Sequence, residues 1–200
     1  MIEILKKIKD KPYRKFYSLY DDALKHDQKS IEAIVIGSLN KDKMIVDCRF
    51  VNLKYIEGNE WTFFSNYNSP KAEDFASHNQ ISAVFYWQKV NTQIRIKAKI
   101  SKSKEEFSDI HFKKRSLKKN ALALSSDQSK PINKFSEVKR NYEKVFEDKE
   151  SLTKRPNFWG GFTFIPFSFE FWQGNVDRIN RRELFTLTSQ DKWEELILQP

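Results

Sequence analysis

The sequence predicts an α+β domain in which short antiparallel strands form a barrel or sandwich and helices lie outside it. Runs rich in Val, Ile, Phe and Trp follow one another with only polar turns between most of them, so no helix-length crossover joins them. Other segments repeat apolar residues at the three- and four-residue spacing of a helix face. The chain has 200 residues, 39% of them hydrophobic, and no low-complexity stretch divides it. We therefore expect one domain over residues 1–200.

Four amphipathic helices are expected. Pro12 suits the first turn of a helix whose apolar face follows it. Ser69 and Pro70 have the pattern of an N-cap and first position, and the helix they open runs to about residue 78. Ser103 and Glu106 have capping-box spacing and start a third helix, and a fourth begins near Asn133. The apolar faces of the first and fourth helices are Tyr13, Phe16, Tyr17, Tyr20 and Leu24, and Phe135, Val138, Tyr142, Val145 and Phe146.

Six or seven strands are expected around one core. The first five runs cover residues 31–37, 43–53, 60–66, 81–90 and 92–101, and residues 182–188 and 193–198 form a final hairpin. A strand from Gly161 changes parity at Ile165 and Pro166, which predicts a bulge or bend at a sheet edge. By that alternation Phe162 and Phe164 share one face, and Phe167, Phe169 and Phe171 share the other.

The charge balance favours an anionic partner. The 36 basic residues against 27 acidic ones give a net charge of +9, and the densest basic run spans residues 113–119. A nucleic acid and a phosphorylated small molecule both fit, but most of these lysines are expected to be solvated surface, so nucleic acid is the less favoured partner. Five glycines allow neither a dinucleotide fingerprint nor a P-loop. A phosphate must therefore be held by side chains and scattered amides.

Cysteine and histidine usage argues against a metal or disulfide. Cys48 is the single cysteine, and His26, His78 and His111 are widely spaced without a ligand pattern. No apolar run approaches the roughly 18 residues of a membrane span, and residues 1–11 do not have the form of a secretory signal. We expect a cytoplasmic protein that does not enter a membrane.

The motifs near the end of the chain carry the strongest functional signal. Asn157-Phe-Trp-Gly-Gly-Phe162 precedes Phe171-Trp-Gln-Gly174, after which Arg178, Arg181 and Arg182 come close together. Together with the segments 49–54, 63–72, 93–95 and 128–129, this order resembles the pyridoxamine 5'-phosphate oxidase family of FMN enzymes. The resemblance implies an FMN-binding split barrel with Greek-key strand order, and a homodimer with FMN at the subunit interface. Residues 157–200 resemble the family's C-terminal dimerisation segment.

The resemblance also implies roles for individual residues. Two of them, Arg178 and Asn180, would face the substrate ring as the catalytic pair, on one face of a strand. The family has Arg at Pro70, Tyr at His111, Ser at Lys119 and His at Asn180. FMN would be held by Arg49, Lys54, Phe64, Ser65, Lys71, Gln93, Gln128, Ser129, Trp172 and Arg182, and the substrate by Lys54, His111, Arg115, Lys119, Arg178 and Asn180.

The implied activity is FMN-dependent oxidation of pyridoxamine or pyridoxine 5'-phosphate to pyridoxal 5'-phosphate, with O2 as acceptor. Because these positions are altered, two alternative functions remain open for the same site. One is an FMN oxidoreductase acting on another anionic substrate, and the other is a non-catalytic protein that binds flavin or pyridoxal phosphate. The aromatic residues Trp172, Phe167, Phe169 and Phe171 could cover a dimer interface or fill the core of one chain.

Overall fold

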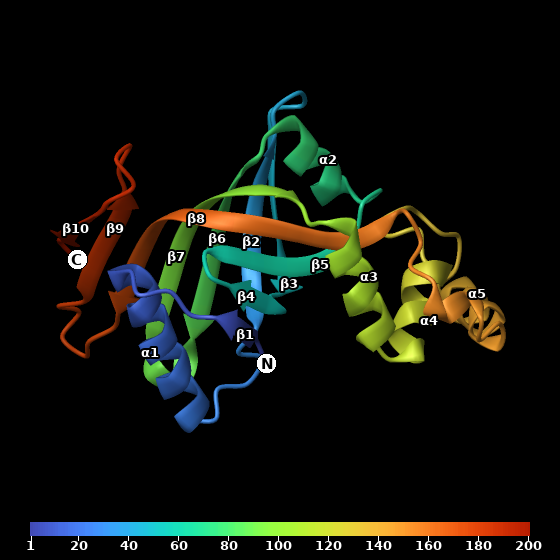
Figure 1. The fold of residues 1–200 in the computed structure, drawn as a ribbon, viewed down its shortest axis with the longest axis horizontal. Coiled ribbons are helices and arrows are strands. Elements are labelled where there is room, and N and C mark those ends of the chain that lie inside the picture. Colours follow the sequence, from blue (N-terminus) through green and yellow to red (C-terminus); the bar gives the residue numbers. More distant parts are fainter.

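The computed structural model describes residues 1–200 and contains ten strands and five α-helices around one core (Figure 1). The strands are β1 Glu3–Lys6, β2 Ala33–Asn40, β3 Ile45–Asn52, β4 Tyr55–Glu57, β5 Glu60–Asn66, β6 Gln80–Trp87, β7 Thr92–Lys102, β8 Trp159–Gln173, β9 Arg181–Leu187 and β10 Trp193–Leu198. The helices are α1 Lys11–Lys25, α2 Pro70–Ser77, α3 Glu105–Lys114, α4 Leu117–Ser125 and α5 Phe135–Glu147. Ten strands exceed the six or seven expected around the core; β1 and β4, which are too short to show an alternating pattern, are the two that no run named in the sequence covers.

The strands form one curved sheet in the order β1-β4-β5-β8-β7-β6-β2-β3, with β9 and β10 branching from β8. Every strand pair is antiparallel except β1 with β4. Strands distant in sequence lie side by side at β2 with β6 and at β5 with β8, as a Greek-key arrangement requires. The predicted α+β class with mostly antiparallel strands and peripheral helices is confirmed.

Strand β8 carries the predicted bulge. Lys97 of β7 lies opposite Ser168 while Ala98 lies opposite Pro166, so Phe167 is the extra residue. On its other side β8 pairs with β5 through residues 159–164 and with β9 through residues 168–173, leaving residues 165–167 without a neighbour there. A proline, which has no amide hydrogen, is tolerated at such a local edge.

The bulge changes which way the phenylalanines point. Phe162 and Phe164 lie before it and Phe169 and Phe171 after it, yet all four belong to the same buried core. The prediction that the two sets face opposite sides was wrong, because the extra residue at Phe167 restores the alternation to the core face. Phe169 is 0% exposed and Phe171 1% exposed within the single chain. Their rings fill the core of one chain and are not surface left over for a dimer interface.

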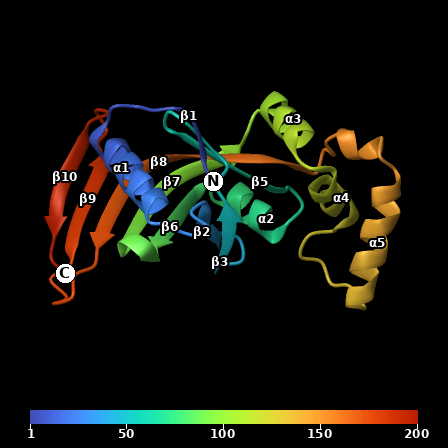
Figure 2. The same ribbon diagram turned by 90° about the horizontal axis from the view of Figure 1, so that it is seen from below.

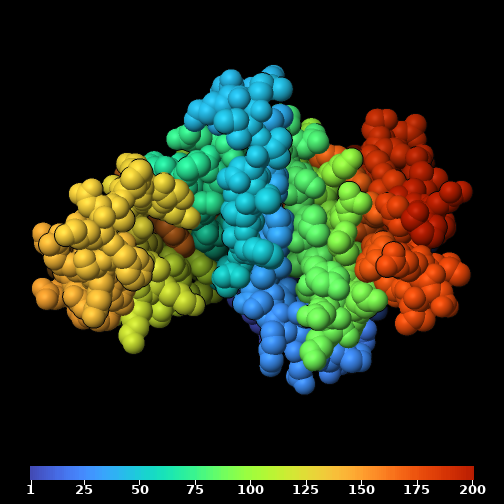
Figure 3. Space-filling model, turned by 180° about the vertical axis from the view of Figure 1, so that it is seen from behind, coloured from blue at the N-terminus to red at the C-terminus, as the bar shows by residue number.

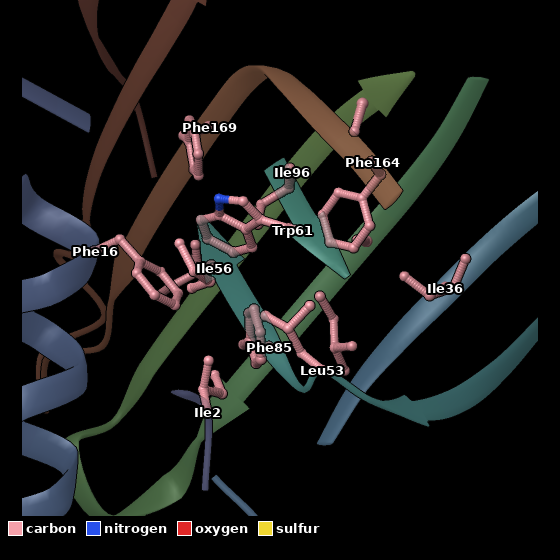
Figure 4. Close-up of a cluster of buried hydrophobic side chains, with 14 of the residues drawn as sticks. Ile2, Phe16, Ile36, Leu53, Ile56, Trp61, Phe85, Ile96, Phe164 and Phe169 are labelled. Carbon is pink, nitrogen blue, oxygen red and sulfur yellow. The ribbon is translucent and has the colours of Figure 1, made fainter. Parts of the chain in front are cut away.

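Trp61 lies near the centre of this core (Figure 4). Its ring centroid lies 4.5 Å from that of Phe16 on α1 and 5.8 Å from those of Phe164 and Phe169 on β8. The core comprises 29 buried residues drawn from the sheet, α1 and α2. The face of α1 predicted from its spacing is buried as expected, except that Leu24 is only partly covered.

Two helix starts differ from expectation. Ser69 occupies the N-cap position of α2, but its hydroxyl donates to the carbonyl oxygen of Asn66 at 2.7 Å and caps no amide. The predicted capping box at Ser103 and Glu106 was wrong: α3 starts at Glu105, and the Ser103 hydroxyl bonds to that of Thr163 at 2.7 Å. The neighbouring strand offers that hydroxyl a closer partner than the helix does.

Helices α4 and α5 form a lobe at the end of the molecule opposite β9 and β10 (Figures 1, 2 and 3). Helix α4 was not expected, since lysines conceal its short apolar pattern. The apolar side of α5 is only half-buried, and the helix contains no buried residue. None of the helices is long and apolar enough to cross a membrane.

The core makes a direct stability prediction. Phe169→Ala should lower the free energy of unfolding by about 3 to 5 kcal/mol, because it opens a cavity among packed aromatic rings. Phe135→Ala is the matched control: the same atoms are removed from a side chain that is 86% exposed. That change should stay within about 0.5 kcal/mol. Denaturant unfolding measures both, and equal losses would contradict this core.

Candidate functional site

A cavity of about 600 Å³ opens between strands β3 to β5, helix α3 and the start of α4. Eight of the residues that the sequence motifs single out line it together: Lys54, Phe64, Ser65, Lys71, His111, Arg115, Lys119 and Gln128. Lys114 raises the number of lining cations to five, against the single carboxylate of Glu3. An adjoining hollow of about 300 Å³ shares four of these lining residues. The cavity is therefore suited to an anionic ligand.

Near the start of α2, the cavity is lined by groups that can donate hydrogen bonds to a phosphate. We call them the α2 donor set. Lys71 follows Pro70 in the first turn and is buried, with its Nζ 3.1 Å from Ser69 Oγ. Burial and the nearby charge of Arg49 lower the pKa of Lys71. Ser65 Oγ donates to Oε1 of Gln128 at 3.5 Å, and the backbone amide of Asn66 donates to the same oxygen at 3.3 Å. Cations and amides at a helix N-terminus are what an anionic phosphate binds.

Arg49 is held on β3 by a network across β2 and α2. Its Nη1 donates to Ser38 Oγ at 2.6 Å and to the carbonyl oxygen of Ile36 at 3.3 Å. Its Nη2 lies 2.7 Å from a carboxylate oxygen of Asp47 and 3.4 Å from one of Asp74. Asp74 is buried and also accepts from Ser38 at 2.6 Å. The guanidinium is thereby fixed beside Lys71 rather than left mobile at the sheet edge.

The wall of the cavity is an aromatic stack. The His111 ring lies 3.7 Å from Phe64 at an interplanar angle of 12°, and Phe64 lies 5.4 Å from Trp159 at 13°. The Arg115 guanidinium lies 4.2 Å from the Trp159 ring centroid. Stacking on tryptophan orients a guanidinium without neutralising it. Arg115 therefore keeps its charge available to a ligand.

Burial and nearby cations determine which groups of this aromatic wall are protonated at neutral pH. The pKa of His111 falls from 6.5 to about 4, first because the ring is buried and then because Arg115, Lys54, Lys114 and Lys119 are near. Burial lowers the pKa of Arg115 to about 10, and burial also lowers that of Lys54. At neutral pH His111 is uncharged and Arg115 is protonated.

The remaining motif residues lie elsewhere. Gln93 of β7, Trp172 of β8 and Arg182 of β9 are direct neighbours across three strands. The guanidinium of Arg182 donates from Nε and Nη2 to Glu170 Oε1 at 2.9 and 2.7 Å, and from Nη1 to the carbonyl oxygen of Gln199 at 3.0 Å. We call Gln93, Trp172, Arg178, Asn180 and Arg182 the C-terminal group.

Arg178 and Asn180 do not alternate along a strand as expected. Strand β9 begins only at Arg181, so both residues lie in the loop after β8. Arg178 is exposed and has a left-handed backbone with φ 59°. Asn180 accepts the backbone amide of Asn175 through Oδ1 at 3.1 Å. The turn that follows Gly174 replaces the extended geometry predicted for this pair.

The cavity and the C-terminal group lie at opposite ends of strand β8. Helices α3 and α4, which border the cavity, lie at one end of β8, and β9 lies at the other (Figures 1 and 2). Trp159 at the start of the strand lines the cavity, and Trp172 near its end belongs to the C-terminal group. Thirteen residues of extended chain span about 40 Å along the strand. Ser129 also lies outside the cavity, in a separate hollow beside α5, with φ 68°. One chain therefore does not bring all the motif residues together.

Several cavity residues had no assigned role in the sequence. Trp159 belongs to a motif quoted above, and its aromatic type beside two glycines was the available signal. Lys114 follows an ordinary helix pattern and gives no signal. The same holds for Asp74, which does not line the cavity but helps to hold Arg49 beside it. Tyr55 lines the cavity directly after Lys54, and its hydroxyl lies 2.8 Å from Nδ1 of His111. Adjacency to the motif strand was the only pointer to it.

Comparison with known proteins supports the family that the sequence motifs indicate. The family model "Pyridoxamine 5'-phosphate oxidase" matches residues 21–148, and "Pyridoxine 5'-phosphate oxidase C-terminal dimerisation region" matches residues 159–200. A pyridoxine/pyridoxamine 5'-phosphate oxidase from Trichormus variabilis is 32% identical over 192 residues, 94% of this chain and 88% of that protein. One from Ehrlichia ruminantium is 33% identical over 192 residues, 94% of this chain and 97% of that protein.

Solved structures show the same fold. PhzG from Burkholderia lata, in complex with tetrahydrophenazine-1-carboxylic acid, matches with a TM-score of 0.87 at 20% identity, over 96% of this chain and 94% of that one. A pyridoxamine 5'-phosphate oxidase-related FMN-binding protein from Nostoc punctiforme matches with a TM-score of 0.78 at 12% identity, over 96% of this chain and all of that one (100%). The predicted split-barrel fold is confirmed. Since the family models and relatives cover nearly the whole chain, it belongs to the pyridoxamine 5'-phosphate oxidase family.

Proposed function

We propose that this protein oxidises pyridoxamine or pyridoxine 5'-phosphate to pyridoxal 5'-phosphate with O2 as electron acceptor. At the coarser level the protein is an FMN-type oxidoreductase of its family. The observation that carries the finer proposal is the cavity, in which five cations surround an aromatic stack large enough to face a pyridine ring. A phosphorylated aromatic substrate satisfies both features at once.

The cofactor is FMN, and the residues at the start of α2 fit its phosphate. Arg49 and Lys71 supply fixed positive charge, and the helix N-terminus adds a favourable dipole. Pro70 stands where the family has arginine, so one cation fewer contributes here. Bound FMN supplies the hydride-accepting chemistry, while the protein orients the substrate and neutralises its phosphate.

The substrate is proposed to bind in the part of the cavity that lies near α3 and the start of α4. Lys54, Arg115 and Lys119 surround one space, so their charges can act on a single phosphate group. Arg115 is oriented by the Trp159 ring and keeps its donors in a fixed plane. His111 is neutral and can donate a hydrogen bond but adds no charge. Arg178 and Asn180 are proposed to face the ring from the C-terminal group.

A second copy of the chain is proposed to complete the site. The C-terminal group lies at the far end of β8 from the cavity, so the two meet only if the C-terminal group of a partner approaches the cavity. The match of residues 159–200 to a dimerisation region supports a homodimer. In this arrangement each of the two sites takes its cavity from one chain and its C-terminal group from the other.

A divergent substrate is the second candidate. His111, Lys119 and Asn180 depart from the family pattern, and two of the three line the cavity. PhzG, which has the same fold, was crystallised in complex with a carboxylic acid. An FMN oxidoreductase acting on another anionic aromatic compound would use the same cations.

Anaerobic mixing decides between these candidates. FMN-loaded protein is mixed with pyridoxamine 5'-phosphate and, separately, with pyridoxine 5'-phosphate while the visible flavin band is followed. Bleaching of the band supports the proposed oxidase. A flavin that stays oxidised with either compound bound removes the oxidase and favours the binding protein or the divergent substrate.

The FMN phosphate site predicts a loss on removing one cation. Arg49→Ala should weaken FMN binding by about tenfold to a hundredfold, because a charge-assisted hydrogen bond contributes about 1.5 to 3 kcal/mol. Arg140→Ala, at an exposed position on α5, is the matched control and should leave FMN affinity unchanged. Flavin fluorescence titration of the apoprotein measures both. Equal affinities for the two variants would remove Arg49 from the site.

A mixed dimer tests whether the site is shared between chains. Arg49→Ala and Arg182→Gln each damage FMN binding in a homodimer, one from the cavity side and one from the C-terminal side. In the heterodimer of these two variants, one site carries both changes and the other carries neither. Differently tagged chains are co-expressed and purified by both tags. FMN at half the wild-type content is expected, whereas a site built within one chain would leave the heterodimer as depleted as its parents.

The protonation of His111 predicts a pH dependence. In the protein without bound FMN, in phosphate-free buffer, its imidazole should titrate near pH 4 instead of 6.5. Because the folded pKa lies below the unfolded one, the contribution to stability is complete above about pH 6.5 and is lost as the pH falls toward 4. NMR of the imidazole signals, assigned by the one missing in His111→Gln, measures the midpoint. A midpoint near 6.5 would show that the ring is solvated and the cations do not act on it.

A further inference from the structure

Tyr55 brings a phenol into the cavity beside His111, the position at which the family pattern has a tyrosine. It is the first residue of β4, is 7% exposed and lines the cavity. Its hydroxyl lies 2.8 Å from Nδ1 of His111. The family has tyrosine where this chain has His111. Tyr55 therefore places a hydroxyl beside the imidazole that replaces the family's phenol.

The two rings are held in place by aromatic packing. His111 stacks on Phe64 at 3.7 Å, and the Tyr55 ring meets His111 edge-on at 5.3 Å and 89°. Tyr55 also packs edge-on against Phe107 at 5.1 Å and Phe64 at 6.1 Å. These contacts come from β5 and α3, on two sides of the pair. The hydroxyl and the imidazole are thus fixed relative to each other before any ligand binds.

Counting protons shows what this pair can offer a ligand. Burial raises the pKa of Tyr55, and the pKa of His111 lies well below neutrality, so both groups are uncharged at pH 7. In one arrangement the Tyr55 hydroxyl donates to Nδ1 and the imidazole keeps its hydrogen on Nε2. In the other, Nδ1 donates to the phenol oxygen and the Tyr55 hydrogen is free. In both arrangements one hydrogen-bond donor remains for a third group.

We propose that Tyr55 and His111 act as one uncharged donor unit, in which Nδ1 of His111 donates to the phenol oxygen and the Tyr55 hydroxyl donates to a phosphate oxygen of the substrate. The charge for this phosphate comes from Lys54, Arg115 and Lys119, which line the same cavity, with Lys114 at its rim and Glu3 as the opposing carboxylate. The pair adds a directed hydrogen bond to that field. This inference rests on the proposed function in taking the ligand to be a phosphate monoester.

Tyr55→Phe tests the pair with the loss of one oxygen atom. Pyridoxal 5'-phosphate affinity of the FMN-loaded protein is measured by equilibrium dialysis, and inorganic phosphate is titrated as a competitor. We expect binding of both to weaken by about tenfold, as for loss of one hydrogen bond to a charged group. FMN affinity should change less, because the hydrogen bond of the Tyr55 hydroxyl is to His111 and not to the α2 donor set. Tyr142→Phe on α5, outside the cavity, is the matched control and should bind as the wild type does.

A second variant separates this role from a structural one. Adding His111→Tyr to Tyr55→Phe returns a phenol to the position where the family has it, and should recover most of the lost affinity. Tyr55→Phe keeps the ring that packs on Phe107 and His111, so the free energy of unfolding should change little while phosphate affinity falls. A single variant that binds as tightly as the wild type, or a folded double variant no better than the single one, overturns the assignment.

The outcomes also distinguish this inference from the proposed oxidase. Tyr55-dependent binding of inorganic phosphate, in a protein whose flavin is not bleached by pyridoxamine or pyridoxine phosphate, removes the oxidase and retains the donor pair. Bleaching that proceeds with unchanged KM in Tyr55→Phe retains the oxidase and removes the pair. A wild-type protein that binds neither pyridoxal phosphate nor inorganic phosphate overturns both.

Discussion

The pairing of strand β8 with three other strands is the interaction on which the rest of this structure depends. Its 15 residues pair with β7 along nearly their whole length, and with β5 and then β9 on the other side. The bulge at Phe167 keeps the aromatic residues before and after it in one core, although the partner strand changes between them. Without that extra residue, one half of the strand would turn its rings to solvent. The same strand carries Trp159 to the cavity and Trp172 to the C-terminal group, so one element sets core packing and the positions of both groups of residues.

A second constraint is the concentration of positive charge in a partly buried space. Five cations line the cavity, and burial lowers the pKa of Lys54, Lys71 and Arg115. Repulsion on this scale is tolerable only if fixed partners hold the charges in place. Within the cavity, Arg115 lies against the face of Trp159, and beside the cavity Arg49 is held by the carboxylates of Asp47 and Asp74. A bound phosphate would relieve the remaining repulsion, so ligand binding and local stability are coupled.

The sequence could predict what is encoded locally. The α1 face, the β5 limits, the bulge near Pro166 and the final hairpin all follow from spacing or from a single proline. It could not predict contacts that depend on distant segments. The hydroxyl of Ser103 bonds to Thr163 instead of capping a helix, and Tyr55 meets His111 across 56 residues of sequence. The motif order did bring eight residues to one cavity, but it could not reveal that the C-terminal group lies at the far end of β8. Sequence order says nothing of which copy of a chain contributes a residue.

The departures from the family pattern have different physical consequences at the two ends of the site. In the cavity, replacing tyrosine by His111 changes no charge, because the imidazole is neutral there and Tyr55 places a phenol beside it. Replacing serine by Lys119 adds a cation where an anion is to be bound. Neither change removes the positive charge or the hydrogen-bond donors that a phosphate site requires. Asn180 differs, because an amide cannot gain or lose a proton and its oxygen already accepts the amide of Asn175. On the proposed function, the phosphate end of the substrate is therefore the part least altered in this chain, and any change of substrate should arise at the ring, where Arg178 and Asn180 are proposed to act from the C-terminal group.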